Sequence, residues 1–224
     1  MRPALAELTE PMANAIGSKL DITYDSAGII GSRVREEEVC DVVIVQKSMM
    51  QRLVDEGHIS AASVKILAYS GLAAAVCEGS ALPDVSSVDA FKRALLDAGT
   101  VSCPDPNAGH LSGIHFQTII EQLGVADILA AKTRYMDGAL EDFAATDIDE
   151  IAITQPMEIL AAPSYVMAGW LPTELQDENK FTWAVGISNR SVAPSAAKAL
   201  VKFLTSPTAI VVYEAKGMLA KMRL

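Results

Sequence analysis

Residues 101–116, VSCPDPNAGHLSGIHF, constrain the fold more than any other stretch of this sequence. They begin with a strand-like Val-Ser-Cys, break at Pro104 and Pro106, and resume as a helical pattern of apolar residues after Gly109. A helix start leaves backbone N–H groups unpaired and carries the positive end of the helix dipole, so a turn of this kind can bind an anion. An ordinary turn between a strand and a helix has the same pattern, and both interpretations stay open here.

A second turn of the same kind lies at residues 25–28, Asp-Ser-Ala-Gly, directly after the strand-like residues 22–24. If the two turns face each other, their helix starts form a clamp around a small anion. The pair of turns therefore favours an anion site over a single structural turn.

The composition fits a packed α/β protein and excludes some partners. Half of the 224 residues are hydrophobic, only 5% are aromatic, and the formal net charge is −10. Nucleic acid is excluded as a partner, because neutralising its phosphates needs a basic face that the sequence lacks. A small anion stays possible, since local donors decide such a contact. The three cysteines (Cys40, Cys77 and Cys103) have no metal-binding spacing, so we expect buried free thiols and no metal or cofactor.

Short strands alternate with helices, which predicts an α/β fold with one or two mostly parallel sheets. The run at 42–45 is continuously β-branched or apolar, as is typical of a parallel strand buried on both faces. In such sheets the ligand lies at the carboxyl ends of the strands. The expected helices are 3–17, 29–38, 49–56, 88–98, 138–145, 194–204 and 208–216, and the expected strands include 21–24, 42–45, 64–76, 133–136, 151–154, 166–170 and 181–187.

The long apolar run at 64–76 and the strands at 166–187 indicate places where the chain crosses from one lobe to another. We therefore expect two α/β lobes. The first comprises residues 1–75 and 184–224, and the second residues 76–183.

The order of motifs resembles the type II periplasmic substrate-binding proteins, most closely the molybdate-binding branch, over nearly the whole chain. The order and spacing of the motifs together carry the resemblance. The carrying residues are Ser26-Ala27-Gly28, Cys40-Asp41-Val42-Val43-Ile44, Pro104-Asp105-Pro106 with Gly109 and Ser112-Gly113, residues 150–154, Phe203-Leu204-Thr205-Ser206-Pro207, and Lys216-Gly217-Met218.

The resemblance implies two parallel-sheet lobes joined by crossing hinge strands, with a small anion captured between them for an ABC transporter permease. Members of this family begin with a strand and a small-residue turn before their first helix, whereas this chain starts inside that helix. We therefore expect one central strand to be missing and the first lobe to have an unpaired edge. Either a partner chain such as a second copy covers that edge, or the first lobe is less stable than the second.

Two positions depart from the family pattern. A serine that would bind an oxyanion appears as Ala27, and a tyrosine expected after the strand at 151–154 appears as Gln155. These changes favour a carboxylate over tetrahedral molybdate. A few similar proteins are isomerases of small polycarboxylates, such as aconitate isomerase, which is the alternative function.

His110 is the one group in the predicted site with an ordinary pKa suited to proton transfer, so it is the catalytic candidate if the protein is an enzyme. Arg33, one to two turns into its helix, could bind a carboxylate with both nitrogens. The predicted ligand-binding residues are Ser26, Ala27, Gly28, Arg33, Asn107, Gly109, His110, Ser112, Gly113, Thr154 and Gln155.

The first residues, MRPALAELTEPM, have no signal-peptide pattern, and no apolar run reaches the ~20 residues that a membrane span needs. As written, the sequence predicts a cytoplasmic protein without membrane insertion. If a signal has been removed, it predicts a periplasmic one.

Overall fold

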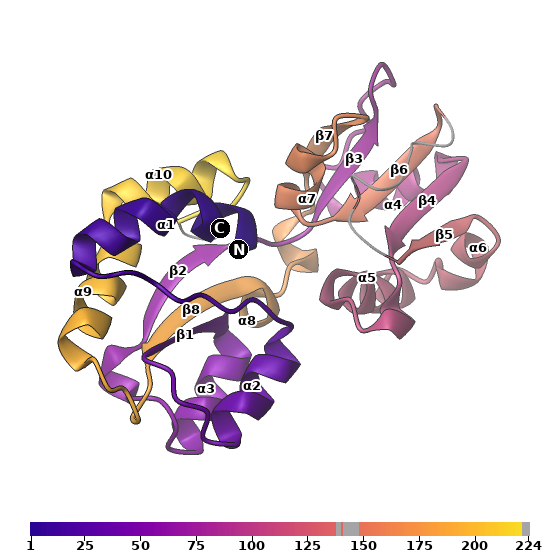
Figure 1. The fold of residues 1–224 in the computed structure, drawn as a ribbon. Helices are drawn as coiled ribbons and strands as arrows, with labels where there is room; N and C mark the ends of the chain where they lie inside the picture. The colour runs from indigo at the N-terminus through magenta and orange to yellow at the C-terminus, as the bar shows by residue number, and fades with distance from the viewer. Residues whose placement is uncertain (138–139, 141–147, 221–224) are drawn as a thin grey trace. The chain divides into compact units, whose positions relative to one another are not determined.

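The computed structural model describes residues 1–137, 140 and 148–220. The chain forms two compact units (Figure 1). Within the described residues, unit 1 contains Met1–Tyr69 and 178–220, and unit 2 contains the residues between Ser70 and Asp177. The two lobes expected from the sequence are therefore present.

The boundaries of the units fall at 69/70 and 177/178, whereas the sequence placed them at 75/76 and 183/184. The run at 64–76 is two strands, β2 (Lys65–Tyr69) and β3 (Ala73–Cys77), in different sheets. The expected boundaries cut through β3 and β8, but each of these strands hydrogen-bonds within one sheet along its whole length.

The sheet of unit 1 has three strands in the order β1-β8-β2, and both pairs are antiparallel. The expectation that 42–45 is a parallel strand buried on both faces is wrong, because β1 alternates between half-buried and buried residues and lies at the sheet edge. A short apolar run does not distinguish the two cases. The elements of unit 1 are α1 (Arg2–Ile16), α2 (Ala27–Arg35), β1 (Val42–Gln46), α3 (Lys47–Asp55), η1 (Ala61–Ser63), β2, α8 (Glu178–Phe181), β8 (Thr182–Ile187), α9 (Pro194–Leu204) and α10 (Pro207–Ala215).

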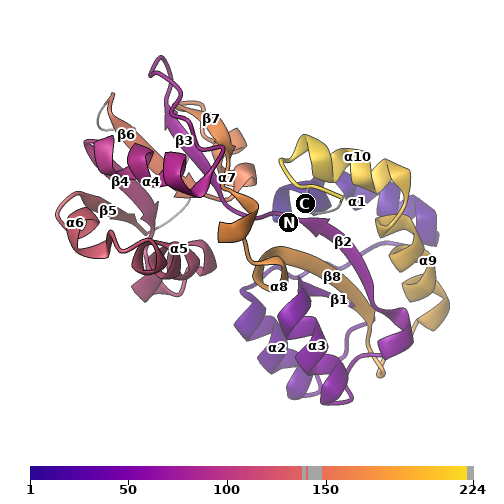
Figure 2. The same ribbon diagram turned by 180° about the vertical axis from the view of Figure 1, so that it is seen from behind.

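Helices cover both faces of this sheet: α1, α9 and α10 gather on one side, and α2 and α3 on the other (Figures 1 and 2). Val43, Val45 and Ala184 point to the α2–α3 face and pack against Met50 and Leu53. Alternate residues of each strand thus reach opposite helical layers, as the two-residue period of a strand requires.

Residues 21–24 do not form the expected strand. They are part of an extended coil between α1 and α2, and they join no sheet. The pattern still has a two-residue period, since Leu20, Ile22 and Tyr24 are half-buried while Asp21 and Thr23 are exposed. Their side chains therefore alternate in exposure as those of a strand do, but the residues belong to neither of the two sheets.

Unit 2 has a five-stranded sheet in the order β5-β4-β6-β3-β7. Only β5, β4 and β6 run parallel to one another, so the expected parallel pairing is confined to them, while β3 is antiparallel to both of its neighbours. The expected helix at 138–145 lies outside the described residues. The elements of unit 2 are β3, α4 (Val88–Asp97), β4 (Thr100–Pro104), η2 (Pro106–Ala108), α5 (Leu111–Gln122), α6 (Ala126–Ala130), β5 (Thr133–Met136), β6 (Glu150–Thr154), α7 (Pro156–Ala161), β7 (Tyr165–Trp170) and η4 (Thr173–Leu175).

A buried ionic cluster lies at the start of β6, away from the strand ends that carry the predicted site. Glu150 is fully buried and accepts hydrogen bonds from the hydroxyls of Ser102 (2.5 Å) and Tyr165 (2.9 Å), while Arg134 lies 3.3 Å away. A buried carboxylate needs such partners, so this cluster ties β4, β5, β6 and β7 together.

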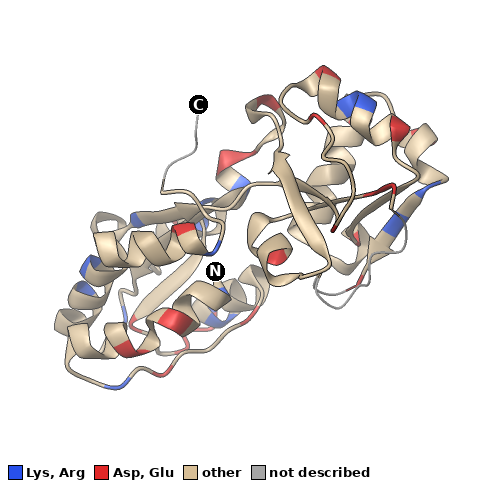
Figure 3. Cartoon of the chain, turned by 90° about the horizontal axis from the view of Figure 1, so that it is seen from above, with Lys and Arg blue, Asp and Glu red and all other residues tan. Residues whose placement is uncertain are grey.

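Charged residues of both signs are interspersed over each unit (Figure 3). Among the described residues, no single helix is long and apolar enough to cross a membrane. The pair α9 and α10, bent by 56°, meets that test only when both helices are counted as one.

Candidate functional site

The predicted site residues of unit 2 gather at one edge of its sheet. The parallel strands β5, β4 and β6 end at Met136, Pro104 and Thr154, and a polar residue follows each end: Asp137, Asp105 and Gln155. Because the carboxyl ends of parallel strands meet at one edge, the loops after them converge there.

The turn after β4 presents the start of α5. Asp105 caps the turn by accepting hydrogen bonds from the backbone N–H and the side-chain amide of Asn107, at 2.8 and 3.2 Å. Gly109 follows with φ of 81°, a left-handed conformation that a residue without a Cβ adopts readily. His110 is the N-cap of α5 and makes no side-chain cap bond, so the N–H groups of the first turn remain available to a ligand.

Gly113 sets how closely α5 approaches β4. A Cβ on this residue would lie 1.9 Å from the carbonyl oxygen of Pro104 and 3.0 Å from the nitrogen of Pro106. Both obstacles are backbone atoms, so only glycine allows this packing. Ser112, its neighbour in the first turn, is buried at 4% exposure.

His110 lies beside an acidic side chain that the sequence analysis did not single out. Its Nε2 is 3.9 Å from a carboxylate oxygen of Asp137, and both side chains are accessible, at 38% and 88% exposure. This contact joins the loop after β5 to the loop after β4.

Thr154 and Gln155 are both engaged within unit 2. The Thr154 hydroxyl donates to the carboxylate of Glu158, in the first turn of α7. The carbonyl oxygen of the Gln155 side chain accepts a hydrogen bond of 2.7 Å from the Ser70 hydroxyl, which leaves its –NH₂ group as a donor.

Glu158 is a second titratable group near His110. Burial raises the pKa of Glu158, and it outweighs the opposite effects of the Thr154 hydrogen bond and of the charge on His110. A raised pKa brings a carboxyl group closer to neutral pH, where it can exchange a proton.

The second predicted turn, in unit 1, is an exposed helix start. Ser26 is the N-cap of α2, and its hydroxyl accepts a hydrogen bond of 3.3 Å from the N–H of Ile29. The carboxylate of Asp25 accepts the N–H of Ser26 at 2.8 Å. The N–H groups of Ala27 and Gly28 complete the first turn, so this start can also bind an anion, although Asp25 places a negative charge beside it.

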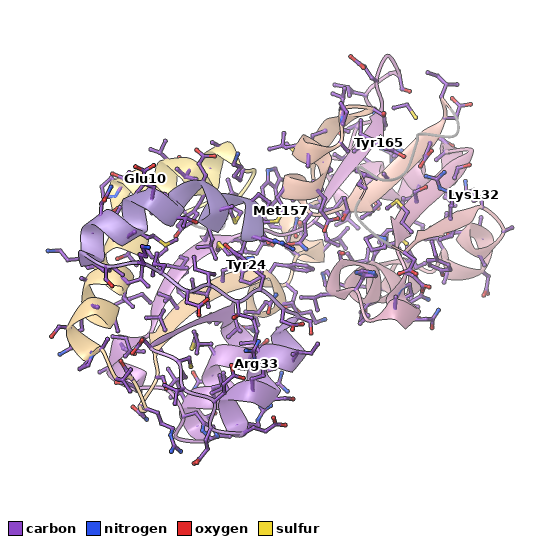
Figure 4. All side chains as sticks on the ribbon, in the orientation of Figure 1. Glu10, Tyr24, Arg33, Lys132, Met157 and Tyr165 are labelled. Carbon is purple, nitrogen blue, oxygen red and sulfur yellow. The ribbon has the colours of Figure 1, made fainter. Side chains whose placement is uncertain are left out.

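Arg33 is paired within its own segment. Its guanidinium binds both carboxylate oxygens of Glu38, with Nε at 2.6 Å from Oε2. Figure 4 shows Arg33 on α2 and Tyr24 on the coil before that helix. Arg33 is thus held by an acidic neighbour, and a ligand carboxylate would have to compete with Glu38 for it.

Within unit 2 the structure brings together seven of the predicted residues at the carboxyl edge of the sheet, and four lie in unit 1. Sequence reasoning missed Asp137, Glu158 and Ser70. Two signals could have identified the acidic pair: Asp137 directly follows a parallel strand, and Glu158 is the third residue of a helix that begins at a proline. The seven residues are Asn107, Gly109, His110, Ser112, Gly113, Thr154 and Gln155.

Other polar side chains have structural roles. His115 is buried, and its Nε2 lies 2.9 Å from the carbonyl oxygen of Leu175. Burial raises the pKa of Cys103 to about 12, so its thiol is not a nucleophile at neutral pH. No group of three or more His, Cys, Asp or Glu side chains that could hold a metal occurs within the described residues.

Comparison with known proteins gives the family. The curated aconitate isomerase of a Pseudomonas species is 29% identical over 221 residues, which cover 96% of this chain and 82% of that protein. A Clostridium difficile chain assigned as the substrate-binding domain of a molybdenum ABC transporter has a TM-score of 0.79 at 17% identity, with 99% of this chain and 95% of that chain covered. The periplasmic molybdate-binding protein of Azotobacter vinelandii has a TM-score of 0.70 at 16% identity, with 98% and 95% covered.

Both solved structures share the two-lobed fold that the motifs predicted, that of a type II periplasmic binding protein of the molybdate-binding kind. The family model for bacterial extracellular solute-binding proteins matches residues 1–219. The chain therefore belongs to the bacterial extracellular solute-binding proteins.

Proposed function

We propose that this protein captures a small anion in the periplasm and delivers it to the permease of an ABC-type uptake system. The observation that carries the proposal is the start of α5, where an N-cap without a side-chain bond leaves the first-turn N–H groups at the carboxyl edge of three parallel strands. Such a start binds an anion through its N–H groups and its dipole. The names of the solved structures that share the fold, both linked to molybdenum or molybdate, agree with an anionic ligand.

The preferred ligand is a carboxylate rather than molybdate. Ala27 supplies no hydroxyl, and Gln155 stands where the family pattern has a tyrosine, so two hydroxyl donors expected for an oxyanion are absent. The side-chain oxygen of Gln155 is held by Ser70, and either N–H of its –NH₂ group can donate to a carboxylate oxygen. That the start of α2 adds donors to the same ligand remains a prediction from the sequence.

A thermal-shift screen tests the ligand class. We expect di- and tricarboxylates to raise the melting temperature more than molybdate, tungstate or sulfate. Ser112→Ala and His110→Ala should reduce the shift, whereas His58→Ala, outside the site, should preserve it. Stabilisation by molybdate or tungstate alone would overturn the carboxylate preference, and no stabilisation by any anion would overturn the function.

A second function, isomerisation of a small polycarboxylate, is favoured by one observation. Glu158 has a raised pKa and lies near enough to His110 for the charge of His110 to influence it. The alternative also agrees with the relative named aconitate isomerase. Moving a double bond in an unsaturated tricarboxylate takes a base that removes a proton from the methylene carbon and an acid that protonates the former alkene carbon. The electron pair of the broken C–H bond becomes the new double bond, so no redox partner is needed.

The isomerase alternative has a direct assay. The protein is incubated with cis-aconitate and followed by proton NMR, with Glu158→Gln and His110→Gln as site variants and His58→Gln as the matched control. Turnover that only the two site variants abolish would establish the enzyme. Saturable binding without turnover would leave the binding protein as the function.

A further inference from the structure

Two glutamine side chains of unit 2 contact residues 70–72, the segment directly before β3. The last pair of the ladder between β3 and β6 joins Ala73 to Thr154. The segment before Ala73 therefore runs toward the carboxyl edge of the parallel strands, where Gln155 follows Thr154. The two glutamines, Gln155 and Gln176, use their amide groups differently, and that difference separates a structural amide from one that is available to a ligand.

The amide group of Gln176 is used at both ends by the backbone. Its Oε1 accepts the N–H of Leu72 at 2.8 Å, and its Nε2 donates to the carbonyl oxygens of Leu72 (2.8 Å) and Leu171 (3.1 Å). A backbone N–H only donates and a carbonyl oxygen only accepts, so these partners fix the orientation of the amide. Gln176 thereby holds the backbone of Leu72 in place.

The amide group of Gln155 is used at its oxygen alone. Oε1 accepts the hydroxyl of Ser70 at 2.7 Å, and the side chain makes no cap bond to α7, the helix that it precedes. Its –NH₂ group has no partner among the residues that the structure describes, and Gln155 is half-buried. The donor end of this amide is therefore available at the same edge as the first-turn N–H groups of α5.

Ser70 meets the other end of that amide from a fixed position. It is fully buried, and it lies two residues before Leu72, whose backbone Gln176 holds. When the –NH₂ group of an amide donates to an anion, the amide oxygen points the opposite way, and an enclosed oxygen without a donor is unfavourable. The hydroxyl of Ser70 supplies the donor that the oxygen of Gln155 needs in this state.

We propose that Ser70 is a positioning residue of the anion site, and that it acts on the ligand only through Gln155. The inference rests on the proposed anion capture and adds to it a residue that is itself fully buried. Without the hydroxyl, a bound anion leaves the oxygen of Gln155 unpaired or loses the –NH₂ donor. Either result should weaken anion binding about tenfold.

Isothermal titration calorimetry with the full chain tests the coupling between the two residues. The probe is tricarballylate, a saturated tricarboxylate with no double bond to move, so the heat reports binding whether or not the protein is an isomerase. Molybdate is the second probe. The natural protein, Ser70→Ala, Gln155→Leu and the double variant form a double-mutant cycle. We expect Ser70→Ala to weaken binding about tenfold in the natural background and by less than about twofold in the Gln155→Leu background.

Two further variants separate this role from a general loss of stability. Ser70→Cys keeps a similar volume and a weaker donor, so its affinity should lie between those of the natural protein and Ser70→Ala. Ser80→Ala removes a hydroxyl that also donates at 2.7 Å, to the carbonyl oxygen of Ile148. Ile148 precedes β6, whereas Gln155 follows it, so Ser80→Ala should leave the affinity unchanged.

Three results would overturn the inference: natural affinity in Ser70→Ala, the same loss of affinity in the Gln155→Leu background, or an equal loss in Ser80→Ala. If Ser70→Ala does not fold, equal affinities of Ser70→Cys and the natural protein would overturn it instead. Binding of neither probe by the natural protein would refute the proposed anion capture itself. Binding without coupling between Ser70 and Gln155 would leave anion capture standing and remove this inference alone.

Discussion

Replacing Gly113 by alanine is the sharpest test of how the start of α5 is positioned. The new Cβ would lie 1.9 Å from the oxygen of Pro104 and 2.9 Å from its carbonyl carbon. Ordinary contact begins at about 3.4 Å, so the helix start would have to move by roughly 1.5 Å away from β4. Forcing extra volume into rigid packing typically costs about 1–3 kcal/mol, and here the three nearest atoms are all backbone atoms of Pro104 and Pro106, so we expect at least about 2 kcal/mol.

The assay uses the two tryptophans of the chain, one in each unit. In a Trp183→Phe background, the fluorescence of Trp170 reports the unfolding of unit 2 alone. A loss of 2 kcal/mol should lower the urea midpoint by about 1 M, given a slope of roughly 1–3 kcal/mol per molar urea. The anion-induced thermal shift should fall with it, because the first-turn N–H groups move.

Gly109 supplies the matched control. A Cβ there meets nothing within 4 Å, so the effect of Gly109→Ala comes only from its φ of 81° and should be about 1–2 kcal/mol. Gly109→Asn should recover part of this loss, because asparagine tolerates the left-handed region, whereas no side chain at position 113 should recover anything. Equal stability of Gly113→Ala and Gly109→Asn would refute the packing argument.

Three further predictions concern unit 2. The raised pKa of Glu158 means that the folded state favours its neutral form, so the stability that this group contributes is full at low pH and is lost as the pH rises through the folded pKa. In urea unfolding from pH 4 to 8, Glu158→Gln should therefore become more stable relative to the natural protein as the pH rises. A difference in stability that stays constant with pH would contradict this. Tyr165→Phe removes a hydrogen bond to the buried carboxylate of Glu150 and should lower the free energy of unfolding by about 1.5–3 kcal/mol. Tyr135→Phe, at an exposed site, should lower it little. Equal urea midpoints for the two variants would be inconsistent with a buried ionic cluster. Iodoacetamide at pH 8 should leave Cys103 unmodified in the folded protein and modify it in urea, since its pKa of about 12 keeps the thiol protonated; mass spectrometry that finds rapid modification of the folded protein would show the thiol to be accessible.

The turn at residues 101–116 was predictable because every local signal agrees. Strand residues, two prolines, a glycine and an apolar helical period follow one another in the order that β4, η2 and α5 adopt. The crossing near residue 70 was also predicted from the apolar run at 64–76, but that run was expected to be one strand, whereas the structure divides it into β2 and β3 in different sheets.

The contacts that complete the site were not predictable from the sequence. Asp137 meets His110 only because β5 pairs with β4, and nothing in either segment specifies that pairing. Ser70 and Gln155 are 85 positions apart in the sequence, and they meet because β3, which follows Ser70, pairs with β6, which precedes Gln155. The antiparallel direction of β1 could not be predicted either, since it depends on β8, whose first residue, Thr182, comes 136 positions after Gln46, the last residue of β1.

The central place of β8 has a consequence for synthesis of the protein on the ribosome. β8 joins β1 to β2, so the sheet of unit 1 cannot close until residues 182–187 have emerged. Unit 2 is a continuous stretch that is complete by residue 177, and all five of its strands are available before that point. At about 5–20 residues per second, translation of residues 70–181 takes about 6 to 22 s. During that time β1 and β2 have been synthesised, but β8, which joins them, has not. Unit 2 can thus fold first, whereas unit 1, whose first residues are synthesised before unit 2, can complete its sheet only afterwards.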